Sequence, residues 1–261
     1  MLQVIDRGAL SSAHPTPLLF VHGAFHGAWC WSENFLDHFA ARGYRALAVT
    51  LRGHTGEPAP HINDVTVADY VADVAAAARS LPTPPVVIGH SMGGFVVQKY
   101  LAAHPAPAGV LLASAPPYGL RRAVLRVARR NIRHSGRPAA LRRPLLFFGN
   151  PAVARATFYS PGTPEELVGR YTELLCDESI RVLYRDLLYA DLAEPARVTA
   201  PMLVLGAADD GFFSQDEVAA TARAYRTHAE FFPGMGHNLM LEPGWLAVAE
   251  HIDSWLSSRS L

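Results

Sequence analysis

The group with the clearest chemical potential is the hydroxyl of Ser91, which lies within the sequence GHSMG at positions 89–93. An apolar run at 85–88 precedes this segment, and helical sequence follows it. A strand that passes directly into a helix forces a tight, strained turn, and flanking glycines remove side chains that would collide there. The first N–H groups of the helix would then face the hydroxyl and stabilise negative charge beside it. The pattern predicts a nucleophilic serine, and the alternative is a glycine-rich turn with a solvated serine.

A second turn of interest is the sequence HGAFHG at 22–27, which follows the apolar run 18–21. Such a continuous apolar run is typical of a buried strand. The two turns together resemble the α/β-hydrolase superfamily, in which a serine on a strand–turn–helix unit attacks an acyl carbonyl. The resemblance implies that the backbone N–H groups of Ala24 and Met92 form an oxyanion hole.

The same turn begins a longer pattern, H-G-x-x-H-G-x-W at 22–29. This pattern resembles the branch of plant methyl esterases and hydroxynitrile lyases, with its bacterial esterase relatives. His26 in that pattern is expected to support the loop by hydrogen bonding and to take no part in catalysis. In the lyases a hydroxyl-bearing residue follows the first histidine, but here the position is Gly23. The resemblance therefore favours hydrolysis over cyanohydrin chemistry.

The superfamily also implies an acid and a histidine that follow the serine in the order Ser, Asp, His. Of the twelve histidines, only His237 lies in a loop after the last predicted core strand at 229–232, within a G-x-G-H sequence. Two aspartates compete for the role of the acid. Asp210 fits the superfamily pattern of an aspartate, one free residue, two apolar residues and a helix start, while Asp209 fits an acid three residues after a glycine. We favour Asp210, with Asp209 as a polar neighbour at the sheet edge.

The elements that must position these groups alternate between apolar, strand-like runs and helical runs, which is typical of a parallel sheet covered by helices. Strands are predicted at 3–6, 18–21, 44–50, 85–88, 109–114, 201–205 and 229–232. Helices are predicted at 33–42, 67–80, 92–104, 215–225 and 245–256. Capping boxes are predicted where Thr66 precedes Asp69 and where Ser214 precedes Glu217. We expect an α/β-hydrolase fold, with a mostly parallel central sheet flanked by helices.

Residues 117–199 lack strand alternation, so we expect a helical lid insertion there, between core segments 1–116 and 200–261. In the superfamily such an insertion roofs the substrate pocket. The insertion carries arginine pairs at 121–122, 129–130 and 142–143. These pairs could attract an anionic substrate, but a solvated helix face is the simpler interpretation. Four aromatic residues are expected near the pocket mouth, namely Phe25, Phe95, Phe212 and Phe213.

The sequence LRGHTG at 51–56 resembles the D-x-R-G-H-G turn of the superfamily. Thr50 replaces the usual aspartate, so this turn must be held in another way. His54 could act as an acid or base by its type, but the resemblance assigns the turn to the scaffold.

The composition restricts the classes of function. The 261 residues carry 23 basic and 23 acidic side chains, so no net field favours nucleic acid or an anionic membrane surface. The two cysteines, Cys30 and Cys176, have no metal-binding spacing. The start of the chain lacks the pattern of a signal peptide, and no stretch is long and apolar enough to span a bilayer. We expect a soluble, cytoplasmic protein that needs neither a metal nor an organic cofactor, and the oligomeric state is left open.

These patterns predict a serine hydrolase that cleaves a carboxylic ester, or a related acyl bond, in a small or medium, largely apolar substrate. The triad would be Ser91, His237 and Asp210, and an acyl-enzyme would form on Ser91. One alternative is a lyase or cyclase that uses the same triad for proton transfer. The other is a receptor-like ligand-binding protein with slow turnover.

Overall fold

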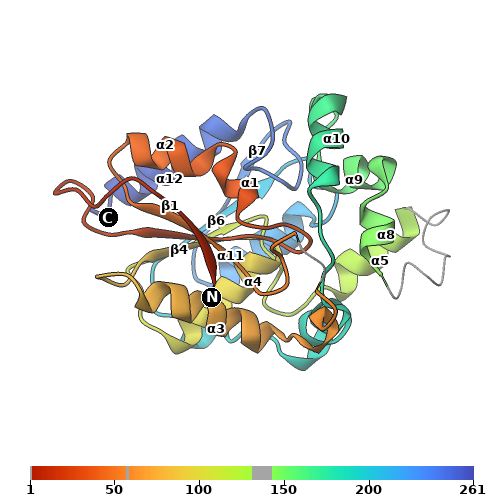
Figure 1. Cartoon of the computed structure of the whole chain (residues 1–261), viewed down its shortest axis with the longest axis horizontal. Helices are drawn as coiled ribbons and strands as arrows, with labels where there is room; N and C mark the ends of the chain where they lie inside the picture. Colours follow the sequence, from red (N-terminus) through yellow and green to blue (C-terminus); the bar gives the residue numbers. More distant parts are fainter. Residues whose placement is uncertain (1, 57–58, 131–142) are drawn as a thin grey trace.

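A single sheet organises the computed structural model, which describes residues 2–56, 59–130 and 143–261 (Figure 1). Within these residues its strands lie in the order β1-β3-β2-β4-β5-β6-β7. Their bounds are Gln3–Arg7 (β1), Leu18–Val21 (β2), Ala46–Thr50 (β3), Val86–His90 (β4), Gly109–Leu112 (β5), Met202–Ala207 (β6) and Ala229–Phe232 (β7). The pair β1–β3 is antiparallel and the other neighbouring pairs are parallel. The prediction of a mostly parallel sheet is confirmed.

The central strands are buried on both faces, which explains their continuous apolar sequence. The side chains of β2 are completely shielded from solvent. Because successive side chains of a strand point to opposite faces, Leu18 and Phe20 belong to one hydrophobic cluster and Leu19 and Val21 belong to the other.

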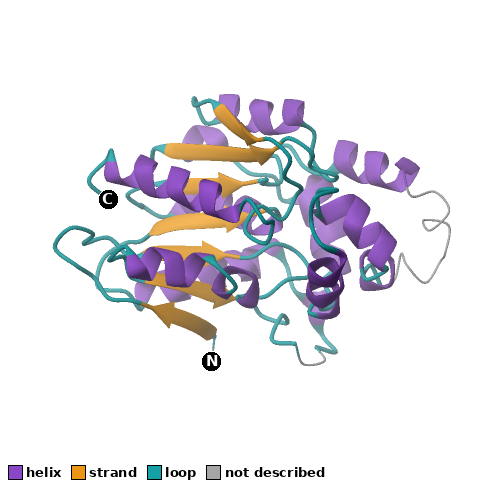
Figure 2. Ribbon diagram, turned by 90° about the horizontal axis from the view of Figure 1, so that it is seen from above, coloured by secondary structure: helices purple, strands orange, loops and turns teal. Residues whose placement is uncertain are grey.

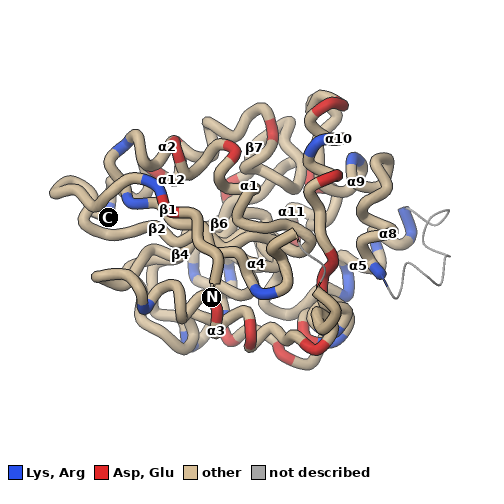
Figure 3. The backbone as a smooth tube through the Cα atoms, in the orientation of Figure 1, with Lys and Arg blue, Asp and Glu red and all other residues tan. Residues whose placement is uncertain are grey.

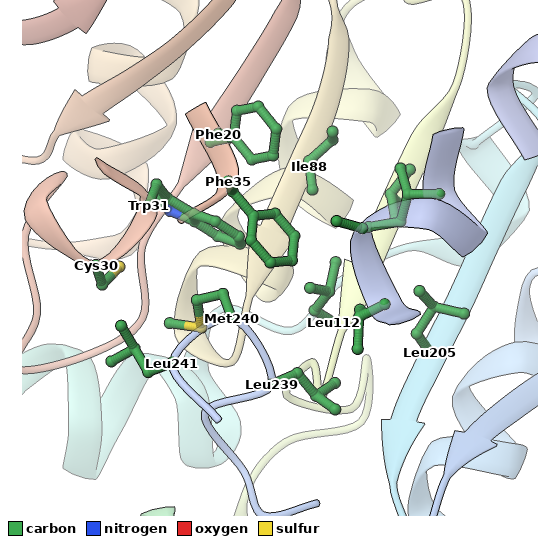
Figure 4. Packing of buried hydrophobic residues seen from close by; sticks show 14 of the residues in the cluster. Phe20, Cys30, Trp31, Phe35, Ile88, Leu112, Leu205, Leu239, Met240 and Leu241 are labelled. Atoms are coloured by element: carbon green, nitrogen blue, oxygen red, sulfur yellow. The ribbon is translucent and has the colours of Figure 1, made fainter. Parts of the chain in front are cut away.

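Helices cover both faces of the sheet, as Figure 1 shows. One face packs against α1 (Trp29–Ser32), α2 (Phe35–Ala41) and α12 (Trp245–Ser257), and the other against α3 (Val67–Arg79), α4 (Met92–Ala103) and α11 (Gln215–Ala224). Figure 4 shows the first of these cores, where Trp31 and Phe35 lie beside Phe20 of β2. None of the described helices is both long and apolar enough to cross a membrane.

The capping motifs in the sequence predicted the starts of two helices correctly. The capping boxes at Thr66 with Asp69 and at Ser214 with Glu217 are both present, and they begin α3 and α11. The helix predicted at 33–42 is present as the slightly shorter α2, and a separate short helix that was not predicted, α1, precedes it. The break between them falls at Asn34, whose side-chain amide donates a hydrogen bond to the carbonyl of Met240 at 3.0 Å. The start of α2 is therefore joined to a loop 206 residues away in the sequence.

Between β5 and β6 the described chain consists of helices and the loops that connect them. It forms α5 (Arg121–Arg130), α8 (Leu145–Phe148), α9 (Pro151–Phe158), α10 (Glu165–Glu173) and the π-helix η2 (Val182–Ala190). Figure 2 shows helices of this insertion beyond the carboxyl ends of the parallel strands. Arg142, from the third predicted arginine pair, lies outside the described residues. We call residues 117–199 the insertion, and its role as a lid stays a prediction.

Candidate active site

Ser91 lies at the sharp turn between β4 and α4, with φ +52° and ψ −120°. This backbone conformation is costly for a residue that carries a side chain, and the surrounding contacts hold it. The Ser91 N–H donates to the carbonyl of Leu112 on β5 at 3.1 Å. A Cβ at Gly89 would lie 2.5 Å from the Gly93 carbonyl oxygen, and one at Gly93 would lie 2.3 Å from that of His22. The turn therefore requires both glycines.

His237, in the loop between β7 and α12, joins Ser91 to Asp210. Its Nε2 lies 2.9 Å from Ser91 Oγ, and its Nδ1 lies 2.9 Å from Asp210 Oδ2. The side chains of His237 and Asp210 are 2% and 1% exposed, so water competes little for this contact. An Nδ1–H donated to the carboxylate leaves Nε2 free to accept the hydroxyl proton of Ser91. The geometry can support general-base activation of the serine.

The carboxylate of Asp210 is oriented by the backbone that follows it. Its Oδ1 accepts the N–H groups of Phe212 at 2.6 Å and Phe213 at 2.9 Å, which turns Oδ2 toward His237. Asp209 is exposed, and its N–H donates to the Met235 carbonyl at 3.0 Å. Of the two aspartates that the sequence left in competition, the structure brings Asp210 to the histidine.

His90, which precedes the serine, supports His237, and no sequence pattern had indicated this contact. Its Nε2–H donates to the backbone carbonyl of His237 at 3.0 Å. Burial, together with the neighbouring His237, holds the pKa of His90 well below its ordinary value, so its imidazole is neutral. A neutral ring that donates from Nε2 joins the end of β4 to the histidine loop.

Ala24 and Met92, the two predicted oxyanion-hole residues, line the same cavity as Ser91. Within the part of the chain that the structure describes, neither backbone N–H has a hydrogen-bond partner. His26 stabilises this loop as expected, because its Nδ1–H donates to the Ala24 carbonyl at 2.8 Å while its Nε2 accepts from the Asn238 amide at 3.2 Å. Burial lowers the pKa of His26 to about 4, which keeps the ring neutral. The two N–H groups can therefore donate to an oxygen that becomes negative.

The cavity above Ser91 has a volume of about 190 Å³ and walls that are mainly apolar. Six phenyl rings line it, from Phe25, Phe147, Phe148, Phe158, Phe212 and Phe213. Besides Ser91 and His237, the polar lining residues among those described are His26, His90 and Tyr184. The expected position of Phe95 is wrong, because that side chain is fully buried in the core between the sheet and its helices. One turn after the serine, α4 already faces the helix–sheet interface there.

The arginines of α5 lie outside this cavity. The described pairs Arg121–Arg122 and Arg129–Arg130 are exposed, and Figure 3 shows basic residues along this outer helix. Arg126, between them, pairs with Glu217 and donates to the Phe212 carbonyl at 2.6 Å. The positions of the described pairs agree with a solvated helix face.

The turn at 51–56 is held without the usual aspartate. Asp73 of α3 accepts the backbone N–H of Arg52 at 2.9 Å and its guanidinium at 2.6 Å. The N–H of Leu51 donates to His22 Nε2 at 3.0 Å, which joins the turn to the oxyanion loop. His54 is not in contact with Ser91 or His237 and instead lies 2.9 Å from Glu178.

The comparisons with known proteins agree on one family. The model of the alpha/beta hydrolase family matches residues 18–250. A monoacylglycerol lipase from Mycolicibacterium smegmatis is 27% identical over 253 residues, which cover 85% of this chain and 81% of the lipase. A rice esterase is 33% identical over 114 residues, and that match covers 41% of this chain and only 42% of the esterase.

Solved structures agree on the fold. A thermophilic esterase from Thermogutta terrifontis superposes with a TM-score of 0.76 at 21% sequence identity. The superposition covers 100% of this chain and 94% of that esterase. At this identity the likeness concerns the fold, and the predicted α/β-hydrolase fold is confirmed.

Proposed function

The chain belongs to the alpha/beta hydrolase family, and we propose that it is a serine hydrolase that cleaves a carboxylic ester or a related acyl bond. The observation that carries the proposal is the hydrogen-bonded series from Ser91 through His237 to Asp210, with 2.9 Å at both contacts of the imidazole. Ester hydrolysis at the level of the family is supported by the esterases and lipases among its relatives.

The proposed reaction proceeds through an acyl-enzyme. His237 Nε2 accepts the proton of Ser91 as Oγ attacks the substrate carbonyl, and Asp210 stabilises the imidazolium that forms. The N–H groups of Ala24 and Met92 donate to the tetrahedral oxyanion. Collapse of this intermediate breaks the ester bond, and His237 gives its proton to the departing alcohol. A water molecule, deprotonated by His237, then attacks the acyl carbonyl. As the acyl bond to Ser91 breaks, His237 returns that proton to Oγ, which releases the acid and restores the serine hydroxyl.

The walls of the cavity support an uncharged, largely apolar substrate of small or medium size. In the described part of the chain, no lysine, arginine, aspartate or glutamate lines it. A charged substrate group would lose its hydration there without a compensating partner. The six phenyl rings instead favour an acyl or alcohol part with apolar or aromatic surface.

The insertion is proposed to act as a lid over this site. It supplies lining residues from α5, α8, α9 and η2, including Val124, Phe147, Phe158 and Leu183. The core supplies the reacting groups, so the insertion would determine substrate shape while the core performs the chemistry.

The geometry at Gly23 supports hydrolysis over the lyase alternative. A Cβ at this position would lie 2.8 Å from His90 Nδ1 and 3.0 Å from Ser91 Cβ. A hydroxyl-bearing side chain, which the lyases place after the first histidine, would therefore displace the serine or His90.

The proposal is tested with a p-nitrophenyl ester and a fluorophosphonate probe. We expect a burst of p-nitrophenol and labelling of Ser91 in the wild type, and neither in Ser91→Ala. The matched control is Ser254→Ala, an exposed serine of α12, which should behave as the wild type. Full turnover by folded Ser91→Ala would refute the proposed mechanism.

A further inference from the structure

A buried carboxylate of the insertion lies close to the oxyanion loop. Glu178 belongs to the extended segment that descends from α10 toward η2 in Figure 1. Its Oε1 accepts the hydroxyl of Tyr70 at 2.6 Å and the N–H of Ser179 at 2.7 Å. Its Oε2 lies 2.9 Å from His54 Nε2, and the side chains of both partners are 0% exposed. We call residues 176–179 the strap.

The contacts of His54 in this cluster favour its positively charged form. Its Nδ1 lies 3.1 Å from the Arg52 carbonyl oxygen, and its Nε2 faces the carboxylate of Glu178. A carbonyl and a carboxylate both accept hydrogen bonds, so a proton on each ring nitrogen satisfies both contacts. Burial alone would lower the pKa of His54, but the charge and hydrogen bond of Glu178, with the backbone carbonyl of Arg52, raise it. The strap is therefore anchored to the core by a buried ion pair, which leaves an uncompensated charge if either partner is removed.

The strap also holds the oxyanion loop directly. The N–H of Cys176 donates to the Phe25 carbonyl at 2.9 Å, and its thiol lies 3.4 Å from the same oxygen. Burial raises the pKa of that thiol to about 12, so it remains a neutral donor. Phe25 has φ +66°, a conformation that a bulky L-residue keeps only when its surroundings impose it.

The turn that carries His54 supports the loop from another side. A Cβ at Gly27 would lie 3.0 Å from the backbone oxygen of His54, so the loop approaches this turn closely. The ring centroids of His54 and His22 are 4.9 Å apart, and His22 begins the loop. The Glu178–His54 pair thus joins two supports of the loop, the strap and the turn.

We propose that Glu178 is a positioning residue for the oxyanion hole. It fixes the strap against His54, and the strap holds the carbonyl of the strained residue Phe25. The Ala24 N–H lies two peptide units before that carbonyl in the same short loop, so holding the carbonyl restricts the direction of this N–H. The inference rests on the proposed function, because an oxyanion forms only in acyl transfer. Removing one oxyanion donor outright typically lowers kcat by about 10² to 10³. Displacing the Ala24 donor should therefore lower kcat by roughly 10- to 100-fold, with little change in KM.

The test compares Glu178→Ala with Glu178→Gln. The glutamine carbonyl can accept from Tyr70 and Ser179 while its amide donates to Nε2 of a neutral His54, so the strap stays in place and kcat should stay within about threefold of the wild type. The alanine removes the anchor, and its kcat should fall while KM stays within about twofold. Binding of a trifluoromethyl ketone, which forms a tetrahedral adduct with a serine, should weaken by the same factor as kcat. Binding of the matching methyl ketone should not.

Asp186→Ala is the matched control for loss of a contact between the insertion and the core. Asp186 is a buried residue of η2 that accepts the N–H of Val67 at 3.2 Å, far in the sequence from the oxyanion loop. We expect it to lower the midpoint of thermal unfolding with kcat nearly unchanged. An equal fall of kcat in Asp186→Ala and Glu178→Ala, or an unchanged kcat in folded Glu178→Ala, would overturn the proposal.

A second pair of variants tests the strap if Glu178→Ala does not fold. Cys176→Pro removes the N–H that holds the Phe25 carbonyl, whereas Cys176→Ala keeps it. The proline should lower kcat by roughly 10-fold or more relative to the alanine, and equal values would contradict the inference. Fluorophosphonate labelling of the wild type distinguishes a failure of the proposed function from a failure of the role proposed for the strap. No labelling at Ser91 refutes the proposed function itself, and labelling with equal kcat in the two variants refutes only the role of the strap.

Discussion

Two histidine–carboxylate pairs in this molecule have nearly the same contact geometry and differ in the partner of the second ring nitrogen. His237 with Asp210 and His54 with Glu178 are both buried, and each has a nitrogen–oxygen distance of 2.9 Å. The second nitrogen of His237 faces the hydroxyl of Ser91, which can give up a proton. The second nitrogen of His54 faces a backbone carbonyl, which cannot. A histidine–carboxylate pair therefore indicates proton transfer only when a third, ionisable partner completes it.

The largest expected difference between the pairs is in turnover. His237→Ala should lower kcat/KM by about 10⁵ to 10⁶, since the serine loses its base. Its free energy of unfolding should change little by comparison. His54→Gln replaces a side chain that does not contact Ser91 with one of similar size, so most of the activity should remain. Steady-state kinetics with urea unfolding of both variants checks this, and similar losses of activity in the two would break the comparison.

The next largest effect separates the neighbouring aspartates. Asp210→Asn should lower kcat by about 10³ to 10⁴, because the amide no longer favours the imidazolium or its tautomer. Asp209→Asn, which changes an exposed side chain, should stay within about twofold of the wild type. Kinetic assays of both purified variants decide between the two residues. A larger loss from Asp209→Asn would reverse the assignment.

A third prediction concerns stability. His54→Ala leaves the Glu178 carboxylate buried without its cationic partner, so the free energy of unfolding should fall by about 3 kcal/mol. Exposed Arg42 with Glu250, an ion pair at 3.4 Å, offers the matched comparison. Glu250→Ala should change stability by less than about 1 kcal/mol. Denaturant unfolding measures both, and equal losses would show that burial is not what makes the His54 pair important.

The smallest effect is a pH dependence of stability. Glu178 raises the pKa of His54 in the folded protein above the ordinary value near 6.5. The stabilisation is therefore complete below about pH 6.5 and is lost as the pH rises through the raised folded pKa. The advantage of the wild type over Glu178→Gln in free energy of unfolding should shrink as the pH rises from about 6.5 through the raised folded pKa. Unfolding curves at several pH values test this, and an advantage that grows with pH would contradict a charged His54.

The sequence was most informative where structure is local. Apolar runs marked the strands, and capping boxes marked the starts of α3 and α11. The glycines around Ser91 indicated the strained turn, because close backbone contacts dictate them. The resemblance to the family, which rested on these motifs, is confirmed by the match over residues 18–250.

Contacts between distant segments could not be predicted in this way. Glu178 and His54 are 124 residues apart, and no periodicity relates the strap to the turn it binds. His90 and His237 are 147 residues apart, and their contact depends on how the last loop returns to β4. The prediction that Phe95 lies near the pocket mouth failed for a related reason, because the direction of this side chain depends on how α4 packs on the sheet. The sequence predicted Ser91, His237 and Asp210 as the reacting groups, and tertiary packing determines which residues contact them.

The most direct measurement is the location of the acyl group during turnover. The wild type is mixed with a slowly hydrolysed ester, quenched in acid and digested, and its peptides are analysed by mass spectrometry. The account predicts one acyl group per chain on the peptide that contains Ser91, and a larger acylated fraction when His237 is intact than in His237→Ala. Acylation of another residue, or product formation with Ser91 unmodified throughout, would contradict it.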